Sequence, residues 1–209
     1  MTHSLHRQGT PQALNDDYVV FAITAQGINA QGSAPLFRRF SEIVEKYSPV
    51  NIGDMRTGNR YSTSLDTIRE STKDNSIYHA VFTDPSVVAK VLAELKAADL
   101  GASIVLSGLF DQLAACCETA GVEQHTIECS LGVWGKTEKL PPKPVQEMST
   151  MCGHGMVGFP LIEHVAAEIA AGRMTTRQGA EVLAGRCHCG VFNPVRAERL
   201  LREMVQPAS

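Results

Sequence analysis

The sequence SIYHAVFTDPSVVAKVLAELKAADLGASIVLSG, residues 76–108, combines two strand-like runs with a helical run between them. Its apolar ends predict strands at 76–84 and 102–108. Asp84 and Pro85 mark the start of the helix, because aspartate accepts hydrogen bonds from the first N–H groups of a helix and proline fits its first position. This stretch therefore predicts a strand–helix–strand unit.

The same alternation continues on both sides of this unit. Further strands are predicted at 17–24, 49–54 and 125–134, and further helices at 34–47 and 109–121. Strands that alternate with helices are typical of α/β proteins with a largely parallel sheet. We therefore predict an α/β fold with a parallel or mixed sheet and flanking helices. A ferredoxin-like or other mixed α+β sandwich is the alternative.

A proline-rich stretch separates this region from the rest of the chain. Residues 136–147 contain three of the ten prolines, which predicts a linker rather than a continuous helix. Beyond it, helices are predicted at 158–171, 176–184 and 194–204. The predicted organisation is an α/β domain at 1–140, followed by a helical, cysteine-bearing segment at 141–209 that packs on it.

Composition narrows the classes of partner. The chain has 209 residues and a formal net charge of −3, so there is no basic bias toward nucleic acid. No apolar run approaches the ~20 residues of a membrane span, and the N-terminal stretch has no signal-peptide core. We expect a cytoplasmic protein that acts on a small molecule and binds neither nucleic acid nor membrane, with a homo-oligomer as one assembly open to it. In that compartment the six cysteines are expected to be reduced, metal-bound or reactive.

Two short motifs carry the unusual residues. TMCGHGMVGFP places Cys152 two positions before His154, and AGRCHCGVFNP places Cys187 two positions before Cys189. The helix predicted at 158–171 runs about 18–20 Å away from the first motif, at 1.5 Å per residue. Since short helix–helix connections favour antiparallel neighbours, the next helix returns the chain to its start. The two motifs are therefore expected to meet, each before a helix start that stabilises thiolates.

The first interpretation of this cluster is a metal site. Cys152, Cys187 and Cys189 with His154 form a standard tetrahedral zinc set, and three cysteines could also hold an iron–sulfur cluster. His154 would be the fourth ligand or a proton-transfer group. An open coordination position would make the metal a Lewis acid, which suits a lyase-type enzyme acting on a small polar, carboxylate-type metabolite. The single residue within each pair differs from the usual zinc-knuckle spacing.

The second interpretation is a metal-free pair of thiols. The eight residues MCGHGMVG resemble the segment around one catalytic cysteine of the proline racemase and hydroxyproline epimerase family. The resemblance implies that Cys152 removes or returns an α-proton, and that Cys189, followed by Gly190, acts on the opposite face of the carbon. A third interpretation is a non-enzymatic subunit or binding module with a structural zinc clasp.

Polar loops at the ends of predicted strands supply candidate substrate contacts. GDMRTGNR contains Asp54, Arg56, Asn59 and Arg60, and Lys136 follows the strand predicted at 125–134. Arginine binds carboxylates and phosphates through paired hydrogen bonds. We predict Arg56, Asn59, Arg60 and Lys136 as substrate contacts, and Asp54 as a catalytic residue beside Cys152 and His154.

The remaining cysteines are predicted to be structural. Cys116 and Cys117 lie in an amphipathic helix and Cys129 in a strand, where free cysteine is commonly buried. Trp134 is predicted either to cap a pocket or to cover the core. Arg7 lies in a polar segment that is expected to be irregular and disordered.

Overall fold

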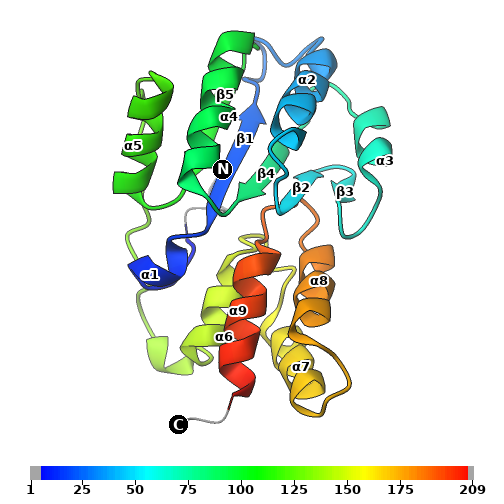
Figure 1. Ribbon diagram of the computed structural model, residues 1–209, viewed down its shortest axis with the longest axis vertical. Helices are drawn as coiled ribbons and strands as arrows, with labels where there is room; N and C mark the ends of the chain where they lie inside the picture. The colour runs from blue at the N-terminus through cyan, green and yellow to red at the C-terminus, as the bar shows by residue number, and fades with distance from the viewer. Residues whose placement is uncertain (1–5, 207–209) are drawn as a thin grey trace.

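The computed structural model describes residues 6–206, and within them five strands form one sheet (Figure 1). The strands are β1 (Tyr18–Ile23), β2 (Asn51–Asp54), β3 (Gly58–Asn59), β4 (Tyr78–Phe82) and β5 (Ser103–Ser107). Their order in the sheet is β3-β2-β4-β1-β5, and every neighbouring pair is antiparallel. The predicted flanking helices are present, so the α/β class is confirmed.

The antiparallel sheet corrects the predicted parallel or mixed sheet. Helix α2 (Ala34–Glu45) joins β1 to β2, and helix α4 (Pro85–Ala98) joins β4 to β5. Each of these connections passes over one strand, because β4 lies between β1 and β2, and β1 lies between β4 and β5. Such split β-α-β units have the ferredoxin-like strand order. They produce the same alternation of strands and helices along the sequence as a parallel sheet does.

The C-terminal part of the chain is helical, as predicted. The remaining helices are α1 (Pro11–Leu14), α3 (Leu65–Glu70), α5 (Phe110–Ala120), the 3₁₀ helix η1 (Thr137–Lys139), α6 (Lys143–Thr150), α7 (Phe159–Ala170), α8 (Thr176–Arg186) and α9 (Pro194–Val205). The stretch 136–147 is not a continuous helix, as predicted, but it contains η1 and the start of α6 in addition to the linking residues. Proline is compatible with that start, because it has no N–H group and the N–H groups of the first helical turn have no partner within the helix.

The segment 125–134 is not a strand. No helix or strand is assigned within it, and its large apolar side chains face solvent: Ile127 is 64% exposed, Leu131 83% and Trp134 82%. Cys129 is exposed rather than packed, and Trp134 does not cover the core. An alternating pattern forms a strand only if it pairs with another strand, and within the described residues β5 pairs with β1 while 125–134 does not extend the sheet.

The sheet separates two apolar cores. On one face, Tyr18 and Val20 of β1 pack with α2, α4 and α5, and this core contains Cys116 and Cys117, as predicted. On the other face, Val19 and Phe21 pack against the C-terminal helices. Figure 1 shows α6–α9 gathered at one end of the sheet, on the opposite side from α2 and α4.

No helix within residues 6–206 is both long enough and apolar enough to cross a bilayer. Residues 1–5 and 207–209, which belong to the two predicted domains, lie outside the described residues.

Candidate functional site

The structure brings the two cysteine motifs into contact. The Sγ atoms of Cys187 and Cys189 are 3.9 Å apart, and Cys189 Sγ is 3.7 Å from Nδ1 of His154. The thiols of Cys152 and Cys187 lie close enough to shift each other's pKa. The four groups form a chain of contacts in the order Cys152, Cys187, Cys189, His154. The two motifs meet for the reason that the sequence predicts: α7 leads away from the first motif and α8 returns to it (Figure 1).

The cluster has a buried side and an exposed side. Cys152, Cys187 and Cys189 are 2%, 0% and 2% exposed and belong to the core between the sheet and the C-terminal helices. His154 lies in the exposed stretch 153–156, which connects α6 to α7. None of the cysteines in residues 6–206 forms a disulfide. The imidazole therefore lies between three buried thiols and solvent.

The predicted helix starts do not surround the thiols. Cys152 follows the end of α6, α7 begins only at Phe159, and Cys187 is the C-cap of α8. The hydrogen bonds come instead from backbone N–H groups of the turns. Those of Val157 and Met156 act against the raised pKa of Cys152, and that of Phe192 acts against the raised pKa of Cys187. That of Val191 adds to the lowered pKa of Cys189. Turn amides thus replace the expected helix dipole as stabilisers of thiolate.

The pKa values of the three thiols are shifted in different directions. Hydrogen bonding with Cys187, followed by burial, raises the pKa of Cys152. For Cys187, the hydrogen bond with Cys152 lowers the pKa, but the one with Cys189 and burial raise it to about 12. The hydrogen bond from Cys187 lowers the pKa of Cys189 despite burial. Negative charge in this cluster is therefore most favourable on Cys189, whose sulfur contacts His154.

Among the predicted substrate contacts, Asn59 lies against the cysteine motif. Its side chain is buried, and its Nδ2 donates to the carbonyl oxygens of Cys187 at 2.7 Å and Ala184 at 3.0 Å. Asp54 is buried and serves the β2–β3 turn, accepting hydrogen bonds from Ile77 N and Thr57 Oγ1.

The other predicted substrate contacts lie elsewhere. Arg60 donates to the Pro49 carbonyl at 2.6 Å, and Arg56 and Lys136 are exposed. Within residues 6–206, Asn59 is thus the member of the predicted polar set that hydrogen-bonds to the cysteine segments.

A buried ionic network beside the cluster was not predicted. Arg7 pairs with Asp17 and donates to the carbonyl oxygens of Met151 and Val191, which are adjacent to Cys152 and close to Cys189. Arg196 is fully buried and pairs with Asp17 at 2.9 Å. The predicted disorder at Arg7 is therefore corrected. The signal that would have revealed the network is an arginine on the apolar face of the last helix.

Cys152, His154, Cys187 and Cys189 do not have the closed arrangement of an assembled metal site. Within residues 6–206, no group of three or more Cys, His, Asp and Glu side chains has the arrangement that holds a metal ion. No family model matches this sequence, and neither a curated protein nor a solved structure matches it significantly.

Proposed function

We propose that this chain is a metal-binding protein whose ligands are Cys152, His154, Cys187 and Cys189. The observation that supports it is the spacing of the ligand atoms. A tetrahedral zinc ion with Zn–S bonds of about 2.3 Å and Zn–N bonds of about 2.0–2.1 Å separates two sulfurs by roughly 3.8 Å, and a sulfur and a nitrogen by roughly 3.6 Å. The distances of 3.9 Å and 3.7 Å lie close to these values.

The donor set favours a single zinc ion. Three thiolates and one imidazole form a standard zinc complement, whereas an iron–sulfur cluster usually takes four cysteines and would separate the sulfurs more widely. Backbone groups of the turns favour the thiolate form of each sulfur, which is the support that a coordinating thiolate needs. Metal binding would require side-chain rotation to close the chain of contacts into a shell. The exposed stretch 153–156, which carries His154, leaves room for that movement.

With all four ligands bound the zinc has no open position, so an exchangeable position would arise by release of the exposed His154 imidazole, because the three sulfurs are buried. A small carboxylate-type ligand would reach the metal there, which is the arrangement of a lyase-type Lewis-acid enzyme. A reducing compartment such as the cytoplasm would keep the thiols available for the ion.

A metal-free thiol enzyme is the second candidate. The contact between Cys189 and His154 favours it, because a thiolate beside an imidazole suits proton transfer. However, Cys187 lies between Cys152 and Cys189 in the chain of contacts. The epimerase resemblance instead implies a substrate carbon between the two sulfurs, so the geometry supports the metal site better.

Metal and acid-labile sulfide analysis of anaerobically purified protein tests the proposal. We expect one zinc per chain and uptake of Co(II) with thiolate charge-transfer absorption. Cys189→Ser should lose both, whereas Cys117→Ser, which changes a buried thiol in the other core, should keep them. A folded, metal-free wild type that takes up neither ion would contradict the metal site, and iron with sulfide would contradict zinc. A Co(II) spectrum that carboxylates do not alter would favour a structural clasp over an enzyme.

A further inference from the structure

The segment that carries Cys187 and Cys189 lies along the β2–β3 edge of the sheet and contacts it at three places. Asn59 of β3 donates to the Cys187 carbonyl at 2.7 Å. Gly190 lies against Gly53 of β2, where a Cβ on either glycine would meet the backbone of the other segment. Asn51 of β2 donates to the Phe192 carbonyl at 2.9 Å. The turn is therefore held by the N-terminal part of the chain as well as by its own helices.

Asn59 is itself held rigidly. It is 0% exposed, and its Oδ1 accepts a hydrogen bond from Tyr61 N at 2.8 Å while its Nδ2 is shared between the carbonyls of Ala184 and Cys187. Its backbone N–H donates to Ser62 Oγ at 3.0 Å. With both ends of the amide occupied, the side chain has one orientation available to it.

The Cys187 carbonyl links the Asn59 amide to the turn that sets the distance between the Cys187 and Cys189 thiols. The same oxygen accepts the N–H of Gly190 at 3.0 Å, which closes the turn that contains Cys189. Asn59 thus holds the atom on which the turn is built. Partners that orient metal ligands in this way control metal retention and the ligand field even though they do not touch the ion.

We infer that Asn59 is a positioning residue for the site and sets the relative placement of Cys187 and Cys189; this rests on the metal-binding function proposed above. The site is then composite, with ligands from the helical segment and their support from the sheet. Asn59→Asp is the sharpest variant, because it places a carboxylate oxygen against two carbonyl oxygens in a space built for an NH₂ group.

The test compares Co(II) and zinc binding by full-length protein. We expect Asn59→Asp to weaken zinc retention against a chelator about 10- to 100-fold and to shift the Co(II) absorption bands. Thr72→Val is the control, because it removes a buried hydrogen bond to the Ile68 carbonyl on the opposite side of the sheet. It should lower stability and leave the spectrum unchanged. If Asn59→Asp does not fold, Asn59→Ser, whose hydroxyl is too short to span both carbonyls, takes its place.

The outcomes separate this inference from the proposed function. A wild type that binds neither ion overturns the metal site and the inference with it. A wild type that binds, together with Asn59 variants that keep its spectrum and its retention, overturns the inference alone. Loss of stability in Asn59→Asp with an unchanged spectrum has the same meaning, since it would show that Asn59 acts on the fold and not on the ligands.

Discussion

Gly190 shows how closely a single residue ties the cysteine-bearing turn to the sheet. Its φ of +81° is in the left-handed region, and an added Cβ would lie 2.6 Å from the nitrogen and 2.8 Å from the Cα of Gly53. These atoms are backbone, so they cannot move aside as a flexible side chain would. Gly190→Ala is therefore expected to lower the free energy of unfolding by about 2 kcal/mol or more, measured by chemical denaturation.

Gly172 provides the matched control for this prediction. Its φ is +71°, but nothing lies within 4 Å of an added Cβ. Gly172→Ala is thus expected to show only the left-handed backbone strain, about 1–2 kcal/mol. Equal losses in the two variants would mean that the contact between Gly190 and Gly53 contributes nothing beyond backbone conformation.

At the scale of an element, the segment 125–134 distinguishes a strand pattern from a strand. In a buried strand, replacing a leucine by serine would cost several kcal/mol. Leu131 is 83% exposed, so Leu131→Ser is expected to change the free energy of unfolding by about 0.5 kcal/mol or less. Leu92→Ser in α4, where the side chain is 5% exposed, is the buried counterpart and should be strongly destabilising. A large loss for Leu131→Ser would show that this segment is packed.

The same contrast explains which elements the sequence predicts. Helices depend on neighbours three and four residues away, and their ends carry local signals, such as the capping box between Thr175 and Gln178. Strand pairing depends on distant residues. Nothing in the alternation of strands and helices tells whether α2 returns the chain beside β1 or one strand further away. Four of the five strands of the sheet were therefore predictable, whereas β3, the absence of a strand at 125–134 and the antiparallel order were not.

The residues of the candidate site were likewise only partly predictable from the sequence. The cysteines are visible because their motifs are short and are joined by a predictable pair of helices. The role of Asn59 depends on the β2–β3 edge lying against Cys187, and the role of Arg7 depends on carbonyls 144 and 184 residues away. Such contacts follow from tertiary packing and leave no periodic signal in the sequence.

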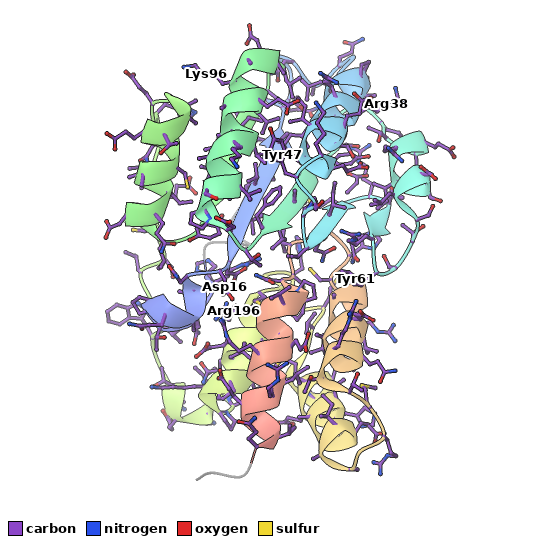
Figure 2. All side chains as sticks on the ribbon, viewed as in Figure 1. Asp16, Arg38, Tyr47, Tyr61, Lys96 and Arg196 are labelled. Carbon is purple, nitrogen blue, oxygen red and sulfur yellow. The ribbon has the colours of Figure 1, made fainter. Side chains whose placement is uncertain are left out.

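At the scale of the whole molecule, one buried network joins segments from both ends of the chain. Asp17, immediately before β1, pairs with Arg7 from the N-terminal segment and with Arg196 from α9. Arg196 also pairs with Glu147 of α6 at 3.1 Å. Figure 2 shows Arg196 near Asp16, where the C-terminal helices meet the start of the sheet. The network therefore contributes to holding the helical segment, and with it the cysteine cluster, against the sheet.

The pH dependence of the free energy of unfolding should differ between wild type and Asp17→Asn, because the variant lacks the Asp17 ion pairs. Burial opposes ionisation of Asp17, but Arg7 and Arg196 outweigh it and hold the pKa below the ordinary 3.8. The folded state then binds the proton less readily than the unfolded chain does. The ion pairs thus stabilise fully above about pH 4, and their contribution is lost as the pH falls through the lowered pKa. Near neutral pH the variant is expected to lose about 3–5 kcal/mol, because two buried arginines lose a charged partner.

Denaturation curves recorded from neutral pH to about pH 3 measure this effect. The gap in unfolding free energy between wild type and Asp17→Asn should narrow on acidification below about pH 4, because the wild type alone loses the ion pairs there. Asp66→Asn is the control; this side chain is 78% exposed and pairs with Arg69 on the helix surface, so a change of about 0.5 kcal/mol or less is expected. A gap for Asp17→Asn that stays constant across the range would show that the ionised carboxylate is not what connects the ends of the chain.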